Sequence, residues 1–255
     1  MRNWITGMLA VMLTLISLVL IWQLADAVLD IPSYTLPSPL EIFDRMLTDW
    51  DVLLKHSRYT LIEVAAGFAM SVVVGIPIAI MIVYFRYFSR AFFPLFIGMN
   101  CVPIVSFAPL LVVWFGYGML TKVLIAFMIS VFPIIINTVI GLRSIEKEML
   151  SLARSLRANS LQAFLYFRLP KSLPYIFGGL KIGITLAVVG SVVSEFVASN
   201  RGLGYLQLTA NARLDTTLVF CVIVTLAIIG VGLYNLVALV ERIAIPWYRS
   251  SREEG

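Results

Sequence analysis

The segment SLARSLRANSLQAFLYFRLP, from Ser151 to Pro170, is basic and amphipathic, yet it lies between long apolar runs. Its apolar side chains recur at steps of three and four residues. This spacing predicts two short amphipathic helices that join between Arg157 and Asn159. An ordered, positively charged loop between hydrophobic spans is a place where a membrane protein can receive a soluble partner. An ordinary solvated loop remains the alternative.

The ends of the second helix are marked by particular residues. Asn159 or Ser160 would cap its start, because a side-chain oxygen there accepts backbone N–H groups that otherwise lack a partner. Leu169–Pro170 would end it, because the residue before a proline is pushed out of helical geometry. The complete loop between the flanking spans covers residues 143–174.

The overall composition indicates that most of the chain lies in lipid. Of its 255 residues, 60% are hydrophobic and 13% are charged, whereas about a quarter are charged in an ordinary soluble domain. The net charge of +5 fits the basic loops of a membrane protein, so nucleic-acid binding is not expected. Cys101 and Cys221 lie in apolar runs far from the single histidine, His56, so no metal site is expected.

Six apolar segments are long enough to cross a bilayer, which takes about 20 helical residues. Helices are the expected form because backbone groups find no water in the hydrocarbon region. The first segment is interpreted as an uncleaved anchor, since its apolar run is too long for a signal peptide. The sequence predicts one all-α, polytopic membrane domain over residues 1–255. The spans are residues 4–24, 60–84, 92–115, 123–142, 175–198 and 218–240.

The charges of the loops predict the orientation. The loops on the side of the 143–174 segment carry about twice as many Lys and Arg residues as the opposite loops. This bias places that segment and both termini in the cytoplasm. Residues 39–55, on the outer side, are predicted to form one amphipathic helix on the membrane surface. Its apolar stripe consists of Leu40, Phe43, Leu47, Trp50 and Leu54.

The 151–170 segment resembles the EAA loop of permease subunits of binding-protein-dependent ABC importers. That pattern is E-A-A, three residues, G, nine residues and I-x-L-P. The corresponding residues here are Ser151-Leu152-Ala153, Arg157, Phe167 and Leu169-Pro170. The chain departs from the pattern at the acidic residue and at the glycine. If the glycine position requires a positive φ, arginine there costs about 1 kcal/mol.

Further short matches follow in order along residues 36–204 and resemble the nitrate, sulfonate and taurine branch of these permeases. They include Leu36-Pro37-Ser38-Pro39, Gly67-Phe68, Ala108-Pro109-Leu110, Trp114-Phe115-Gly116-Tyr117-Gly118, Phe132-Pro133 and Gly202-Leu203-Gly204. The resemblance implies a fold like that of type I ABC importer permeases, in the cytoplasmic (inner) membrane of a prokaryote.

The resemblance also implies partners. The loop would insert into a groove of a cytoplasmic ABC ATPase dimer and transmit its closure to the membrane helices. The other implied partners are an extracytoplasmic solute-binding protein, a second permease copy and membrane lipid. No cofactor is expected in this chain, because ATP and Mg would be bound by the ATPase. The implied coupling residues are Ser151, Leu152, Ala153, Arg154, Arg157, Ala158, Asn159, Leu169 and Pro170.

Polar, small and helix-breaking positions inside the spans are candidates for a translocation pathway or gate. They are Gly183, Ala187, Ser191, Glu195, Pro103 and Asn137. The first four follow one another at four-residue steps on one helical ridge, and packing of helices within one chain or between two copies explains them equally well. Glu195 is costly to bury in lipid, so a half-solvated position or a gate near the outer end is expected.

The predicted function is a permease subunit of an ATP-driven, binding-protein-dependent importer. Its solute would be a small anion, such as a sulfonate, nitrate or a carboxylate, or else a vitamin precursor. The sequence contains no G-x-x-x-x-G-K-[ST] pattern and no Ser-His-Asp or His-Glu-x-x-His arrangement, so the chain itself is not expected to be an enzyme. An ion-coupled secondary carrier and a non-transporting membrane scaffold stay open as alternatives.

Overall fold

A computed structural model of the chain describes residues 2–29, 32–85, 87–91, 94, 98 and 102–247. Within these residues the regular elements are helical, which confirms the predicted all-α class. The elements are α1 (Arg2–Leu29), α2 (Pro39–Thr48), α3 (Trp50–Tyr84), η1 (Ile104–Phe107), α5 (Ala108–Phe115), α6 (Met119–Arg143), α7 (Lys147–Ser155), α8 (Ser160–Ala163), η2 (Phe164–Arg168), α9 (Leu169–Ala198), α10 (Leu203–Ala212) and α11 (Thr216–Ala244).

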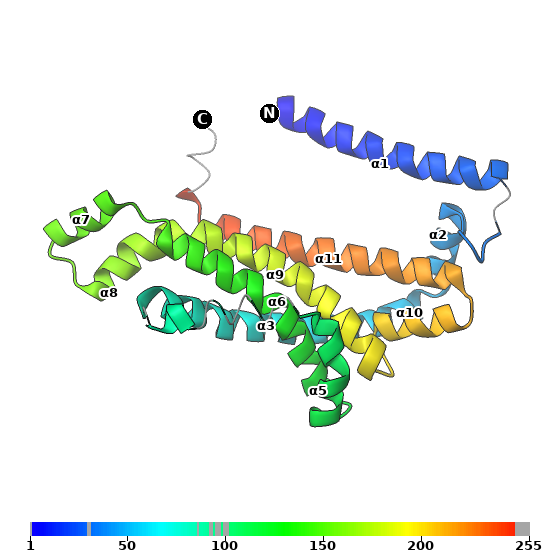
Figure 1. Cartoon of the computed structure of the whole chain (residues 1–255). Helices are drawn as coiled ribbons and strands as arrows, with labels where there is room; N and C mark the ends of the chain where they lie inside the picture. Colours follow the sequence, from blue (N-terminus) through cyan, green and yellow to red (C-terminus); the bar gives the residue numbers. More distant parts are fainter. Residues whose placement is uncertain are drawn as a thin grey trace.

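The long helices α3, α6, α9 and α11 run along one another and form the body of the molecule (Figure 1). The short helices α7 and α8 lie at one end of this bundle, and α2 and α10 lie at the other. We call these the elbow end and the α10 end. Under the predicted orientation the elbow end faces the cytoplasm.

Five segments of the described chain are long and apolar enough to cross a membrane. The predicted span 92–115 lies partly outside the described residues, and its described part holds η1 and α5, which together form one short apolar segment. The count of six spans and the orientation therefore stay predictions. The five segments are Met12–Leu29, Trp50–Tyr84, Met119–Arg143, Ser160–Ala198 and Thr216–Ala244.

The prediction of a single helix over residues 39–55 is wrong. The chain leaves helical geometry at Asp49, where φ is −97° and ψ is 19°, and α3 then continues without interruption from Trp50 into the bundle. Arg45 Nε lies 2.6 Å from an Asp49 carboxylate oxygen, and Arg45 Nη2 lies 3.1 Å from Asp215. The guanidinium thus holds the break between α2 and α3 against the turn that precedes α11.

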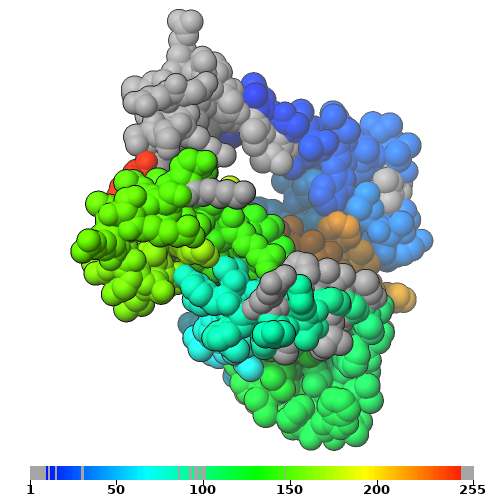
Figure 2. Space-filling view, turned by 60° about the vertical axis from the view of Figure 1, so that its left-hand side comes forward, coloured from blue at the N-terminus to red at the C-terminus, as the bar shows by residue number. Residues whose placement is uncertain are grey.

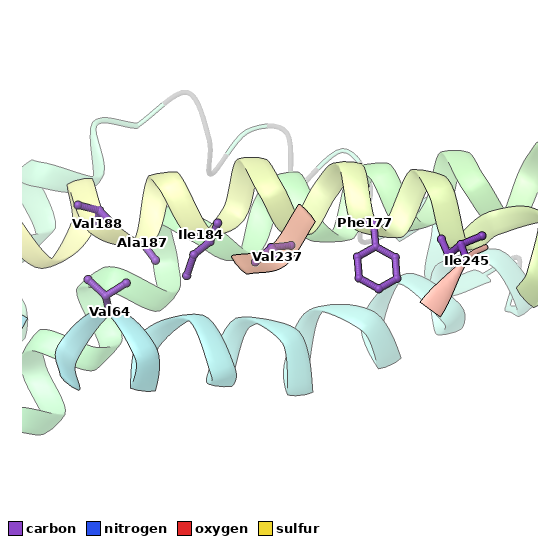
Figure 3. Packing of buried hydrophobic residues seen from close by; sticks show 7 residues of the cluster. All are labelled: Val64, Phe177, Ile184, Ala187, Val188, Val237 and Ile245. Atoms are coloured by element: carbon purple, nitrogen blue, oxygen red, sulfur yellow. The ribbon is translucent and has the colours of Figure 1, made fainter. Parts of the chain in front are cut away.

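The core of the bundle is a layer of aliphatic side chains between α3, α9 and α11 (Figure 3). Val64 of α3 faces Ala187 and Val188 of α9, and Val237 of α11 joins the same cluster. Side chains of this type have no polar atoms to satisfy, so dispersion contacts and close fit hold the helices together in lipid.

Small residues bring α6 and α9 into close contact. A Cβ atom on Gly179 would lie 2.8 Å from Asn137 Cβ and 3.0 Å from Pro133 O, which is closer than ordinary packing allows. A Cβ on Gly183 would meet Ile134 at 2.8 Å. Gly179 and Gly183 of the α9 ridge therefore pack against α6 of the same chain. This is one of the two packing explanations that the sequence left open.

The C-terminal part of helix α1 contacts the body of the molecule. The Trp22 ring lies 5.7 Å from the Phe220 ring, centroid to centroid, and Gln23 Oε1 accepts a hydrogen bond from Leu40 N at 3.3 Å. Among the side chains of Met12–Leu29 that the structure describes, none is buried in the single chain. Figure 2 shows α1 (blue) lying apart from the region of α7 and α8 (yellow-green).

Candidate functional site

The end of α7 is closed by a Schellman motif. Ala158 N donates to Ala153 O at 3.0 Å, and Arg157 N donates to Arg154 O at 2.9 Å. These two reverse hydrogen bonds enclose one residue in the left-handed region. That residue is Arg157, whose φ is 54°. The glycine position of the EAA pattern therefore has a positive φ in this chain. Under that condition a backbone cost of about 1 kcal/mol is expected for arginine.

Asn159 caps α8, as predicted. Its side-chain oxygen accepts from Gln162 N at 2.8 Å, and Asn159 N donates to Gln162 Oε1 at 2.9 Å. This reciprocal pair is a capping box, which satisfies two donors that a helix start leaves free. The turn between α7 and α8 is consequently fixed by local hydrogen bonds on both sides.

The prediction that Leu169–Pro170 ends the second helix is wrong. From α8 the chain passes through the π-helix η2 directly into α9, and Leu169 N donates to Phe164 O. In a regular α-helix the ring of Pro170 would clash with the carbonyl four residues earlier, and the wider π turn relieves this clash. The elbow, defined here as residues 146–168, is therefore continuous with α9, which has 30 residues and is about 45 Å long.

The structure brings the predicted coupling residues together at the elbow end. Ser151, Leu152, Arg154, Arg157 and Asn159 are exposed, Ala158, Leu169 and Pro170 are half-buried, and Ala153 is buried. Large apolar side chains of the elbow are also exposed, with Leu156 at 66% and Leu161 at 63%. Since apolar side chains gathered on a capped helix pair are typical of interaction surfaces, the elbow has the character of a docking element.

The elbow also contacts the end of α3. The Phe164 and Tyr84 rings meet edge to face with centroids 6.0 Å apart, and the Arg168 guanidinium lies 5.4 Å from the centre of the Tyr84 ring. Aromatic and cation–π contacts of this kind contribute about 0.5–1 kcal/mol each at exposed sites. A displacement of the elbow would thus act on α3 as well as on α9.

A second polar assembly lies at the α10 end and surrounds Glu195. The carboxylate is fully buried; one oxygen accepts from Thr60 Oγ1 at 2.7 Å and the other from Gly204 N at 2.5 Å. Thr60 Oγ1 in turn accepts from Leu203 N at 2.9 Å. Of the two alternatives for Glu195, the half-solvated position is therefore wrong, because Thr60 of α3 and Gly204 of α10 supply hydrogen bonds in place of water. A role in a gate stays a prediction.

An ion pair lies next to Glu195. Lys122 Nζ is 2.7 Å from Glu63 Oε1 and 2.6 Å from Ser199 Oγ, and both charged side chains are at least nine-tenths buried. Removing either partner would leave the other charge buried without compensation. We call Glu63, Lys122, Glu195 and Thr60 the charge cluster. It connects α3, α6 and α9 at one point.

Two glycines explain how the chain approaches Glu195 so closely. Gly202 has a φ of 106°, a conformation that favours glycine, and a Cβ atom there would overlap the Glu195 carboxylate. A Cβ on Gly204 would also lie too close to that carboxylate. His56 Nδ1 lies 2.8 Å from Gly202 O and 3.1 Å from Gly202 N, which fixes the loop from the side of α3.

Sequence reasoning identified Glu195 but missed Glu63, Lys122 and Thr60 as its neighbours. A signal was available, since Glu63 is an acidic residue inside the predicted span 60–84 and needs a partner there. The identity of the partner could not be found in the same way, because Lys122 is 59 positions away in the chain.

The remaining candidates for a translocation pathway differ in burial and do not form one cluster. Gly183, Ala187 and Ser191 are buried within the chain, and Asn137 is half-buried and donates to Pro133 O at 2.8 Å. Pro103 is exposed and precedes η1 in an extended conformation. The structure places Gly183 at the α6–α9 contact and Ala187 in the core cluster with Val64 of α3. The role of all these residues in a pathway stays a prediction.

Several known transport permeases are similar in sequence to this chain over most of its length. The riboflavin transport system permease protein RibX of Chloroflexus aurantiacus is 36% identical over 93% of this chain and 89% of its own length. The formylaminopyrimidine transport permease protein ThiX of Halalkalibacterium halodurans is 32% identical over 90% of this chain and 92% of its own length. The taurine transport system permease protein TauC of Escherichia coli is 28% identical over 95% and 88%.

Solved structures show the same fold. A chain of an amino acid ABC transporter crystallised with histidines superposes with a TM-score of 0.62 at 17% identity, over 78% of this chain and 97% of that one. The family model of binding-protein-dependent transport system inner membrane components matches residues 71–244. The chain therefore belongs to this family and is a multi-pass permease subunit of a binding-protein-dependent ABC importer.

Proposed function

We propose that this permease imports a planar nitrogen heteroaromatic compound, of the class to which flavins and aminopyrimidines belong, and that it is driven by ATPase subunits docked on the elbow. The relatives named for riboflavin and formylaminopyrimidine are 36% and 32% identical to the chain. Those named for sulfonates, taurine and nitrate are 27–29% identical. This difference favours the vitamin-precursor class over the anions that the sequence pattern also allowed.

The geometry of the elbow carries the coupling part of the proposal. A Schellman motif and a capping box fix its shape, its apolar side chains are exposed, and its second helix continues into α9. A surface of this kind suits a groove on a cytoplasmic ABC ATPase, which binds ATP and Mg. Two permease copies in the inner membrane would then present two elbows to an ATPase dimer.

The continuity of α9 supplies the transmission. Closure of the ATPases displaces the elbow, and α9 carries the displacement about 45 Å to the charge cluster. The permease needs two packings whose balance the ATPases shift through different contacts with each state. An extracytoplasmic binding protein delivers the solute at the α10 end.

Cysteine cross-linking tests the docking. In a cysteine-free background, Leu156→Cys should form cross-links with the co-expressed ATPase through a short bifunctional reagent. Leu214→Cys, which is 78% exposed at the α10 end, is the matched control and should form none. Cross-linking at Leu214 but not at Leu156 would reverse the assignment of the two ends.

Uptake into proteoliposomes tests the transport function. Accumulation of the solute should require ATP, the ATPase and the binding protein together. Uptake that follows a proton or sodium gradient without the ATPase would identify a secondary carrier instead. Assembly with the ATPase but no flux under any of these conditions would indicate a scaffold.

A further inference from the structure

Two glutamates of the charge cluster lie against each other at the α10 end. Glu63 belongs to α3 and Glu195 to α9, and their carboxylates are within hydrogen-bonding distance of each other. Glu63 is 2% exposed and Glu195 is 0% exposed. Two ionised carboxylates in contact repel each other strongly where water is excluded. Their close approach therefore needs a group between them that removes the repulsion.

The hydrogen bonds around the pair leave one carboxylate oxygen without a donor. Glu195 accepts from Thr60 Oγ1 and from Gly204 N, and Glu63 Oε1 accepts from Lys122 Nζ at 2.7 Å. Glu63 Oε2 is buried against the Glu195 carboxylate and accepts no hydrogen bond from an N–H or O–H donor of the described residues. Buried acceptors of this kind are rare because each missing hydrogen bond is costly. The missing donor therefore belongs at the contact between the two carboxylates.

The buried charges of the cluster do not balance if both glutamates are ionised. The ion pairs of the described residues connect the two carboxylates to one basic side chain, Lys122. Arg201 is exposed, and its guanidinium lies 4.9 Å from the centre of the Tyr59 ring. Two carboxylates and one ammonium leave one negative charge without compensation, which is costly away from water. A proton is the smallest group that cancels this charge and also supplies a donor.

The other titratable groups around the pair come from several elements. His56 Nδ1 lies within hydrogen-bonding distance of Gly202, and its ring stacks on that of Tyr205 with centroids 6.2 Å apart. The helix α5, which also packs against α9, contains no charged residue. The charged and titratable side chains that surround the two glutamates are Lys122 of α6, Arg201 before α10, His56 and Tyr59 of α3, and Tyr205 of α10.

We propose that Glu63 and Glu195 share one proton at neutral pH and that this proton is a condition for closure of the α10 end. It lies between Glu63 Oε2 and the nearer oxygen of Glu195, so that one carboxyl group donates to the other. The buried cluster then contains one negative and one positive charge, and Gly204 N closes over Glu195. Loss of the proton at high pH leaves two like charges in contact beneath α10 and loosens this end.

The pH dependence of unfolding tests the shared proton. A solvated glutamate of the unfolded chain releases its proton above about pH 5, whereas the folded chain keeps one, so stability should fall as the pH rises. From about pH 5.5 to about pH 7.5, the unfolding equilibrium constant in mixed micelles should rise about tenfold per pH unit for the wild type relative to Glu195→Gln. This comparison cancels the titration of His56 and of the other groups.

The two variants differ in the proton that they hold. The amide of Glu195→Gln is neutral and donates to Glu63 without a bound proton, so the extra pH dependence should vanish. Glu146→Gln changes an exposed glutamate of the elbow and is the matched control, which should keep the wild-type dependence. Equal pH dependence in the wild type and in Glu195→Gln would overturn the shared proton, with a water molecule then donating to Oε2. Stability that follows the sodium concentration instead of the pH would also overturn it, in favour of a bound cation.

Infrared spectroscopy of the full wild-type chain keeps the proposal testable if Glu195→Gln does not fold. At neutral pH, protein that carries ¹³C in its glutamate carboxyl groups should show the C=O band of a protonated carboxyl group, shifted by the label. Absence of this band in the wild type would overturn the shared proton.

Hydrogen exchange tests the connection to α10. The ratio of exchange rates between the wild type and Glu195→Gln should rise with pH at the α10 amides, because opening of this end releases the proton. The same ratio at the α7 amides should stay constant. The ratio cancels the intrinsic pH dependence of exchange. A ratio at α10 that does not change with pH would overturn the role of the proton in closing this end.

Discussion

Two lysine–glutamate ion pairs lie at opposite ends of the bundle, and they differ in their surroundings. At the α10 end, Lys122 and Glu63 are 2.7 Å apart with side-chain exposures of 9% and 3%. At the elbow end, Lys171 and Glu146 are 3.3 Å apart with exposures of 48% and 63%. Water solvates each ion of the exposed pair and weakens their attraction, whereas each ion of the buried pair depends on the other. The same pair of residue types therefore has different consequences at the two ends.

The difference extends to how each end keeps its shape. The turn between α7 and α8 in the elbow is held by hydrogen bonds between residues at most five positions apart, such as Ala158 to Ala153 and Gln162 to Asn159. The charge cluster is held by contacts such as Thr60 to Glu195, 135 positions apart. A locally closed element can shift as a unit against a partner without losing its form. The α10 end can change only if three helices rearrange together.

The largest effect should follow the loss of the buried lysine. Lys122→Met leaves the Glu63 carboxylate buried beside Glu195 without its counter-ion, and this should lower the free energy of unfolding by about 3–5 kcal/mol. Denaturant unfolding in mixed micelles measures the loss. The double variant Glu63→Gln/Lys122→Met removes both charges and should recover at least half of it. A loss below about 1 kcal/mol in the single variant would show that water reaches the cluster and would remove the contrast between the two ends.

A smaller effect is expected where α9 connects the two ends. Gly179→Ala places a methyl group 2.8 Å from Asn137 Cβ and 3.0 Å from Pro133 O, so α6 and α9 must separate at a cost of about 1–3 kcal/mol. Gly178→Ala is the matched control in the same helix, because a Cβ there meets no described heavy atom within 4 Å. The control should be neutral or stabilise the fold by up to about 1 kcal/mol. Equal thermal shifts in the two variants would refute the tight α6–α9 contact.

The two ends also differ in how much the sequence could predict about them. The sequence narrowed the cap of α8 to Asn159 or Ser160 and placed Arg157 at the turn, because both signals depend on near neighbours in the chain. The passage of the helix through Pro170 was missed, because the local rule against proline does not include the π turn that accommodates it.

At the α10 end the sequence predicted less. Glu195 was identified from its cost in lipid, but its burial was not, because the atoms that replace water come from Thr60 and Gly204 on other elements. The small residues of α9 predicted close packing, and only the folded chain shows that α6 is the neighbour. Hydropathy located the five long apolar helices of the described residues, since apolar length is a local property. It carries no information on which helix packs against which.

The turn of the elbow should respond to a change of about 1 kcal/mol. Arg157→Gly relieves the strain of a positive φ and should stabilise the elbow by about that amount, which would appear as slower hydrogen exchange of the α7 and α8 amides. Arg157→Ala removes the same charge but keeps the strain, and it should give no such protection. If both variants reduce ATP-dependent uptake equally, the guanidinium contacts the ATPase. If Arg157→Gly alone changes uptake, the stiffness of the turn matters instead.

The smallest effect should come from the exposed pair. Lys171→Met makes the same chemical change as Lys122→Met, but Glu146 remains solvated when its partner is lost, so the free energy of unfolding should change by less than about 1 kcal/mol. The measurement is the same denaturant titration in mixed micelles, and its salt dependence should be weak because the pair contributes little to begin with. A loss as large as that of Lys122→Met would mean that the elbow end is stabilised by long-range charge contacts too. In that case the elbow could not move as a unit, and the ATPases would have to act through a rearrangement of the whole bundle.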